Sequence, residues 1–284
     1  MTSSLRYLKD RAVQIDIFQA TILGAVQGLT EFLPISSRAH LILIPWLFGW
    51  PDPGLTFDLA LHLGTLAALL IYFRKDWIYL TISAFRLLKG NTEDPDARLA
   101  LYIILATIPG AIAGLLFEHL EDELSTPKVI AATLIVLAVL LRAAELQGRR
   151  KTDLGNLKLS DALAIGFAQT LAVIPGVSRS GVTITAGLFR GMKRKAAAQF
   201  SFLLSAPIIG GAVAKKLIDV AQEGLPSDQW LPFAVGIIVS ALFGFISISA
   251  LMRYLQTRST FIFIYYRIAL GIVVLTLGYF WGLQ

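Results

Sequence analysis

Six stretches of this chain are apolar over nearly the whole length that a helix needs to cross a lipid bilayer. They cover residues 57–73, 99–117, 129–144, 197–214, 231–252 and 261–283. A spanning helix needs roughly 20 apolar residues, and in hydrocarbon its backbone polar groups must be satisfied within the segment. Only 15% of the residues are charged, against roughly 25% in a soluble domain. The sequence therefore predicts an all-α integral membrane protein with six transmembrane helices.

The net charge of +6 does not indicate nucleic-acid binding, because Lys and Arg gather in the short connections between the apolar stretches. Sixteen of them fall in one alternating set of connections, six lie on the opposite side and three lie within apolar segments. Cytoplasmic loops are enriched in Lys and Arg. This bias predicts that the sixteen are cytoplasmic and that both chain termini lie outside.

Two further apolar regions, 17–50 and 159–190, are each interrupted midway by Pro, Gly, Ser and Arg. The interruptions Pro34-Ile35-Ser36-Ser37-Arg38 and Pro175-Gly176-Val177-Ser178-Arg179 share the pattern Pro-x-x-Ser-Arg. A simple lipid-facing helix does not tolerate such a break. Each region is therefore predicted to form a re-entrant helical hairpin.

The two hairpin regions also divide the chain into halves. Three predicted spans follow each hairpin, so the second half starts on the opposite side of the membrane from the first. We expect one membrane domain built as an inverted repeat. The first repeat covers residues 1–145 with hairpin 17–50, and the second covers residues 155–284 with hairpin 159–190.

Polar side chains gather around both breaks. Gln27 and Glu31 share one helical face just before the first break, and His40 follows three residues after Ser37. The corresponding residues of the second break are Ser178, Arg179, Ser180 and Thr183. Ser36, Ser37 and Ser178 can serve as N-caps of the returning half-helices, a role compatible with catalysis. Capping does not account for charges at membrane depth, which cost at least about 2.5–3.5 kcal/mol each.

These residue types suit phosphoryl transfer. Two half-helix N-termini present unpaired N–H groups and positive dipole ends to an anion, and the Arg179 guanidinium matches phosphate oxygens. The hydroxyl of Ser37 or the imidazole of His40 can attack phosphorus. A carboxylate such as Glu31 can hold a divalent cation or activate water.

The two motifs resemble the signatures of the undecaprenyl-pyrophosphate phosphatase family, the bacitracin-resistance type. Gln27-x-x-x-Glu31-Phe32-Leu33-Pro34-Ile35-Ser36-Ser37-x-x-His40 is similar to the first signature, and Pro175-Gly176-Val177-Ser178-Arg179-Ser180-Gly181-x-Thr183 to the second. The resemblance implies hydrolysis of undecaprenyl pyrophosphate to the monophosphate in the bacterial plasma membrane. Such a reaction recycles the carrier lipid for cell-wall synthesis.

The resemblance also implies roles for individual residues. The catalytic set is Glu31, Ser37, His40 and Arg179; the substrate-binding set is Gln27, Ser36, Ser178, Ser180 and Thr183; and Glu31 is the ligand of a divalent cation, Mg²⁺ or Ca²⁺. We expect the site to open outwards, with the polyprenyl pyrophosphate and the bilayer as partners and with a homodimer as the assembly. Two departures are Gln27, where many members carry a second Glu, and Arg38-Ala39 in place of the more usual Thr-Gly.

Other interpretations stay open at this point. Inverted repeats with broken helices are also a transporter architecture. The other lipid phosphatase superfamily is excluded, because its signature carries a His six residues after the Arg of its Ser-Arg pair, where this chain has Thr185. Asp58 and His62 can form an ion pair, a polar lining or a support for the site, which we favour. Arg267 in the last span can be buried against a partner or can snorkel.

Overall fold

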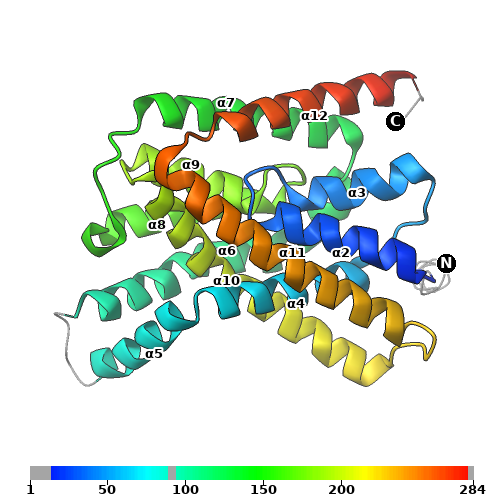
Figure 1. Cartoon of the computed structure of the whole chain (residues 1–284), viewed down its shortest axis with the longest axis horizontal. Helices are drawn as coiled ribbons and strands as arrows, with labels where there is room; N and C mark the ends of the chain where they lie inside the picture. Colours follow the sequence, from blue (N-terminus) through cyan, green and yellow to red (C-terminus); the bar gives the residue numbers. More distant parts are fainter. Residues whose placement is uncertain (1–13, 89–93, 281–284) are drawn as a thin grey trace.

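The computed structural model describes residues 14–88 and 94–280 of the 284-residue chain. Within these residues the chain is helical and contains no β-strand. The helices are α2 Ile17–Glu31, α3 Ser37–Phe48, α4 Leu55–Tyr72, α5 Arg74–Leu88, α6 Pro95–Leu124, α7 Pro127–Gln147, η1 Leu154–Asn156, α8 Leu159–Gln169, η2 Thr170–Val173, α9 Arg179–Phe189, α10 Arg194–Glu223, α11 Trp230–Thr257 and α12 Phe261–Phe280 (Figure 1).

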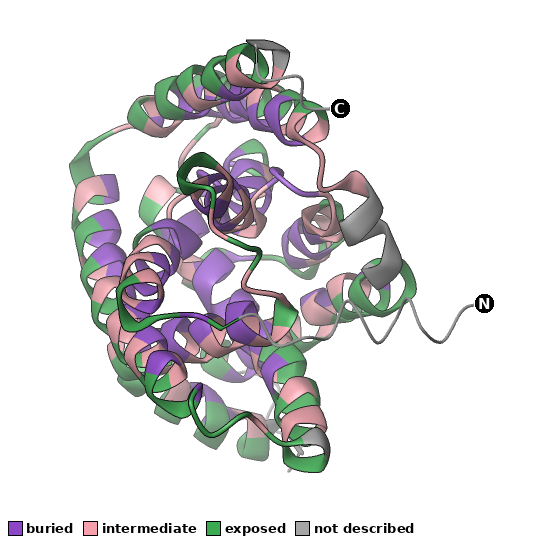
Figure 2. Ribbon diagram, turned by 90° about the vertical axis from the view of Figure 1, so that its right-hand side faces the viewer, coloured by how far each residue is buried: buried purple, intermediate pink, exposed green. Residues whose placement is uncertain are grey.

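The prediction of six spans is confirmed. Among the described residues, six helices are long and apolar enough to cross a membrane, and they are α4, α6, α7, α10, α11 and α12. Each of the six predicted apolar stretches falls on one of them, and residues 281–283 of the last stretch lie outside the described residues. The outward-facing sides of the helices are apolar, since Ile104, Leu115 and Ile238 are each more than half exposed. Figure 2 shows buried residues facing the interior of the bundle and exposed residues on its outside.

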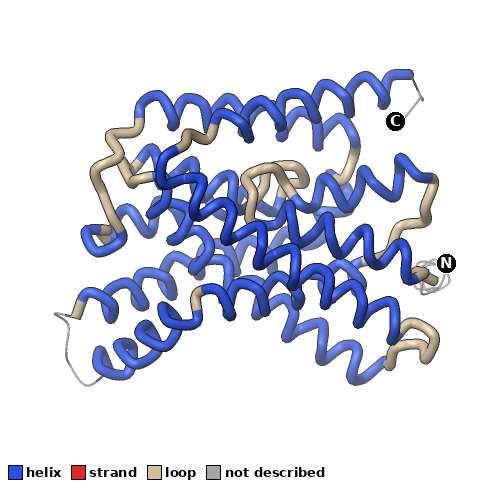
Figure 3. Tube along the Cα trace, in the orientation of Figure 1, coloured by secondary structure: helices blue, strands red, loops and turns tan. Residues whose placement is uncertain are grey.

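The two interrupted regions each form a pair of short helices joined by a turn. Region 17–50 forms α2 and α3, and region 159–190 forms α8, η2 and α9. The α2–α3 pair opens towards one end of the bundle and the α8–α9 pair towards the other, and their turns meet near the middle (Figures 1 and 3). Two points stay predictions: that these pairs are re-entrant hairpins in the membrane, and that the two halves of the chain form an inverted repeat.

Helix α5 lies between the apolar stretches 57–73 and 99–117, where the sequence pattern predicts only a connection. It is only 15 residues long and carries basic residues between apolar ones. Ile78, Tyr79 and Phe85 are more than half exposed. The helix packs against α6, and the Ser83 hydroxyl donates to the Asp94 carboxylate at 2.9 Å. A search for long apolar stretches misses such a helix because it is short and amphipathic.

Small residues bring α2 and α11 into close contact. An added Cβ at Gly24 would lie 2.7 Å from the carbonyl oxygen of Gly236, and one at Gly28 would lie 2.6 Å from that of Ser240. Glycine spacing of this kind lets membrane helices approach until their backbones touch. Across the same contact the Ser247 hydroxyl donates to the carbonyl of Leu29 at 2.9 Å. The packing fixes the helix that carries the first polar cluster.

Candidate active site

Both turns place a serine in the same unusual backbone conformation. Ser36 has φ 73° and Ser178 has φ 69°, in the left-handed region that non-glycine residues rarely adopt. Each hydroxyl caps the next helix: Ser36 accepts from the amide of Ala39 and Ser178 from that of Gly181 at 3.1 Å. The capping interpretation is therefore confirmed for these two serines. Ser37 is instead the first residue of α3. Strain repeated at two positions is typical of functional sites.

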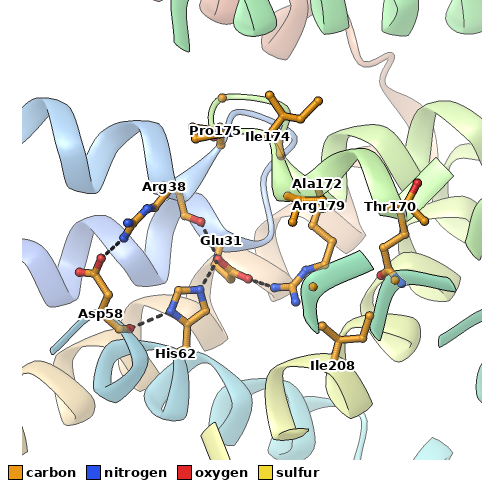
Figure 4. A pocket seen from close by; sticks show the side chains of 18 of the residues that line it. Glu31, Arg38, Asp58, His62, Thr170, Ala172, Ile174, Pro175, Arg179 and Ile208 are labelled. Atoms are coloured by element: carbon orange, nitrogen blue, oxygen red, sulfur yellow. Dashed lines mark hydrogen bonds and ion pairs between the residues drawn. The ribbon is translucent and has the colours of Figure 1, made fainter. Parts of the chain in front are cut away.

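Glu31 lies at the centre of the first turn. Its Oε2 atom accepts hydrogen bonds from the Ser37 hydroxyl at 2.6 Å and from Nε2 of Gln27 at 3.1 Å. Its Oε1 atom forms an ion pair with Arg179, the first residue of α9. Nε2 of His62 lies 3.6 Å from Oε2. Figure 4 shows Glu31 between His62 and Arg179. One buried carboxylate therefore joins groups from α2, α3, α4 and α9.

The two turns also meet through the backbone. The Ser180 hydroxyl donates to the carbonyl oxygen of Leu33 at 3.0 Å. Arg267 from α12 is fully buried, and its guanidinium donates to Pro34 O at 3.1 Å and to Gly176 O at 2.8 Å. The alternative that Arg267 snorkels is therefore wrong. Its partners are backbone carbonyls of both turns, so the side chain ties them together.

A cavity of about 260 Å³ opens between the turns. Of the predicted site residues its wall includes Glu31, Ser36, Ser37, Ser178 and Arg179. The wall also includes Arg38, Asp58, His62 and Gln169. Arg38 forms an ion pair with Asp58, so both charges of the first turn have counter-charges in the wall.

The other four predicted residues lie behind this wall. Gln27 is fully buried and supports Glu31. Thr183 donates to the carbonyl of Arg179 at 2.7 Å and exchanges a hydrogen bond with Ser201 at 2.6 Å. Ser180 is 3% exposed. His40, the fourth, also lies behind it. Their contacts with substrate stay predictions.

His40 is held by partners on both ring nitrogens. Nδ1 lies 2.7 Å from the Ser36 carbonyl oxygen and must donate to it, because a carbonyl only accepts. If the ring is neutral, Nε2 then accepts a hydrogen bond from the hydroxyl of Tyr266, which lies 2.6 Å away. Tyr266 had no signal in the sequence beyond being an aromatic residue in an apolar span. The structure thus places His40 where it can support the backbone of the first turn.

His62 both contacts Glu31 and lines the cavity, so the structure agrees with the polar-lining alternative as well as with the favoured supporting role. Its Nδ1 donates to the backbone carbonyl of Asp58 at 2.7 Å, which turns Nε2 towards Glu31. The Asp58 carboxylate pairs with Arg38. The i, i+4 spacing on α4 therefore orients the imidazole through the backbone.

Comparisons with known proteins agree with the two motifs. The family described as "Bacitracin resistance protein BacA" matches residues 20–273. A protein named undecaprenyl-diphosphatase from Geobacter metallireducens is 48% identical over 258 residues, covering 90% of this chain and 96% of the relative. Proteins of the same name from Geotalea daltonii and Pelotomaculum thermopropionicum are each 50% identical, covering 92% of this chain and 98% and 97% of the relatives. The chain therefore belongs to the bacitracin resistance protein BacA family.

Proposed function

We propose that this chain is an undecaprenyl-diphosphatase that hydrolyses undecaprenyl pyrophosphate to undecaprenyl phosphate and inorganic phosphate. The printed names of the relatives and the family match support this activity. The observation that carries it is the position of the Glu31 carboxylate, which bridges a hydroxyl at the start of α3 and a guanidinium at the start of α9. In the cell the reaction returns the carrier lipid for cell-wall synthesis and confers bacitracin resistance.

The geometry assigns each group a step. Ser37 attacks the terminal phosphorus as its proton passes to Glu31, 2.6 Å away. The bond from the terminal phosphorus to the bridging oxygen breaks, and undecaprenyl phosphate leaves with the electron pair. Arg179 exchanges its contact with Glu31 for the phosphoryl oxygens and stabilises their charge. Glu31 passes the serine proton to the departing undecaprenyl phosphate. Water then attacks the phosphoserine, and the free Glu31 carboxylate accepts its proton and returns it to the Ser37 oxygen as inorganic phosphate leaves.

Ser37 is predicted to be the nucleophile in preference to His40. Ser37 lines the cavity and hydrogen-bonds to a carboxylate, whereas both nitrogens of His40 have partners behind the wall. Rapid denaturation of the enzyme at neutral pH during turnover, which preserves both phosphoserine and phosphohistidine, followed by peptide mass spectrometry, should find phosphate on Ser37. Phosphate on His40 would reverse the assignment, and labelling absent from both would indicate direct attack by water.

A divalent cation is proposed as the cofactor, Mg²⁺ or Ca²⁺. No group of three or more His, Cys, Asp or Glu side chains suited to a metal occurs in residues 14–88 and 94–280. Phosphoryl-transfer sites often hold Mg²⁺ with one or two carboxylates and the substrate phosphates. Glu31 offers such a carboxylate, and the buried Oε1 of Gln27 has no hydrogen-bond partner within the described residues. Glu31 lines the cavity and could hold a cation there, which would neutralise phosphate charge when bound.

The decisive test of the function is phosphate release by the purified wild-type protein in detergent. Undecaprenyl pyrophosphate should yield equal amounts of undecaprenyl phosphate and inorganic phosphate. A transporter with this architecture would bind the lipid but release no phosphate, because detergent abolishes the two compartments. The same assay with farnesyl pyrophosphate measures how far the chain length of the lipid matters.

We propose that the cavity opens to the outer face of the bacterial plasma membrane. The connections that carry most of the basic residues lie at one end of the bundle, whereas the first residues of α4 lie at the other. The wild-type chain has no cysteine, which allows single-cysteine labelling. Leu59 lines the cavity, and Lys151 is exposed in a basic connection.

In spheroplasts, a membrane-impermeant thiol reagent should label Leu59→Cys at once and Lys151→Cys only after permeabilisation. The reverse pattern would contradict outward access and place the mouth in the cytoplasm.

We also propose that the chain is one membrane domain built from the repeats 1–145 and 155–284. The matching strain of Ser36 and Ser178 supports this division, as do the opposite directions in which the α2–α3 and α8–α9 pairs open. A homodimer stays a prediction.

A further inference from the structure

Gln169 carries the least satisfied side chain of the cavity wall. It is the last residue of α8, lines the cavity and is 3% exposed. Neither its Oε1 nor its Nε2 atom has a hydrogen-bond partner in the parts of the chain that the structure describes. A buried amide without partners destabilises a fold, so in a cavity wall it needs a partner that enters the cavity, either a ligand or a water molecule.

The neighbouring helix leaves room for this amide. An added Cβ at Gly110 of α6 would lie 2.7 Å from Nε2 of Gln169 and 2.8 Å from Cδ1 of Ile208. Gly114, one turn later on the same helix, also lines the cavity, but an added Cβ there would meet nothing within 4 Å. A side chain at position 110 would therefore push the Gln169 amide and the end of the Ile208 side chain aside, whereas one at position 114 would displace neither.

The wall of the cavity continues along the chain from Gln169. Thr170 follows Gln169 along the chain, and Figure 4 shows Arg179 between Glu31 on one side and Thr170 on the other. The Thr170 hydroxyl already donates to the carbonyl of Phe167 at 2.7 Å. The wall residues that follow, Ala172, Val173 and Ile174, carry no polar side chain. Among the side chains of wall residues 169–174, the amide of Gln169 is therefore the group that can donate a hydrogen bond to a ligand in the cavity.

We propose that the amide of Gln169 donates its N–H groups to a phosphoryl oxygen, forming a second phosphate subsite opposite Ser37. The inference rests on the proposed phosphatase function. A pyrophosphate carries two phosphoryl groups, and the Glu31, Ser37 and Arg179 cluster acts on the terminal one. The second subsite takes either the phosphate that stays on the lipid or the inorganic phosphate after hydrolysis. Both present the same oxygen acceptors.

The first test replaces Gln169 by Met, which keeps the volume and removes both donors. The Michaelis constant for undecaprenyl pyrophosphate should rise about tenfold, the effect expected for losing a hydrogen bond to a charged group, while kcat changes much less. The melting temperature should be unchanged or higher, because an unpartnered amide is replaced by an apolar side chain. A merely structural amide would leave the Michaelis constant alone.

Gly110→Ala should reproduce the rise because its methyl group displaces the amide. Gly211→Ala is the control and should not, because Gly211 of α10 does not line the cavity and an added Cβ there would meet nothing within 4 Å. Inhibition constants separate the two sources of phosphate. Weaker inhibition of Gln169→Met by undecaprenyl monophosphate assigns the subsite to the lipid phosphate, and weaker inhibition by inorganic phosphate assigns it to the released one.

Unchanged Michaelis and inhibition constants in Gln169→Met would overturn the proposed subsite. Equal effects of the two glycine variants on the Michaelis constant would do the same. Absence of phosphate release by the wild-type protein would instead overturn the proposed function, so the two failures are distinguishable.

Discussion

Replacing Arg179 by Lys is expected to lower kcat/KM about 100-fold, and replacing it by Ala about 1,000-fold, the range found when a donor to developing charge is removed. The guanidinium presents parallel N–H groups that match two phosphoryl oxygens, whereas an ammonium is a point charge. Arg179 lines the cavity and is placed by the first turn of α9. Steady-state kinetics on purified variants measure the effect.

A matched control comes from the same chain. Arg190 pairs with the buried Asp161 through Nε at 2.7 Å, and neither residue lines the cavity. Arg190→Lys should therefore keep near wild-type turnover. If Arg179→Lys also keeps near wild-type turnover, the guanidinium does not bind phosphate through two parallel hydrogen bonds.

Replacing Glu31 by Gln is expected to lower kcat about 1,000-fold, within the range for losing a general base. The amide keeps the shape of the carboxylate and can still accept from Ser37, but it cannot take the proton. The change also leaves Arg179 without its counter-charge. Because Arg179 remains available to the phosphates, the loss should appear in kcat and not as a raised Michaelis constant.

Asp161→Asn provides the control, since it also removes a buried carboxylate from an arginine pair. Its turnover should stay close to that of the wild type. Residual activity of Glu31→Gln at the level of this control would show that another group accepts the proton.

The transmembrane helices could be predicted from the sequence because lipid imposes a simple rule, a long apolar segment with its backbone satisfied internally. The turns could be predicted because their residues depart from this rule. Pro34 and Arg179 break that rule, and such breaks persist in a membrane only where protein encloses them. Two breaks with the same residues then indicated one site, and the structure joins them through Glu31 and Arg179.

Contacts between residues far apart in the chain were not predictable. The partner of His40 is Tyr266, and the partners of Arg267 are carbonyl oxygens, which every residue carries. The amide of Gln169 has no hydrogen-bond partner among the described residues and lies against Gly110. The sequence gives no reason to single out that glycine. Each of these depends on three-dimensional packing and leaves no pattern in a single sequence.

The central claim is that the turn carrying Glu31 and the turn carrying Arg179 act on the same phosphoryl group. A double-mutant cycle with the mild changes Glu31→Asp and Arg179→Lys tests it through single-turnover rates of phosphate release. Groups that act as a unit are not additive. If each single change costs about 100-fold, as in the range for one catalytic group, the double variant should be less than about tenfold slower than the slower single variant. A multiplicative loss of about 10,000-fold, the sum of two independent free-energy costs, would show that the two residues act separately and would contradict the account.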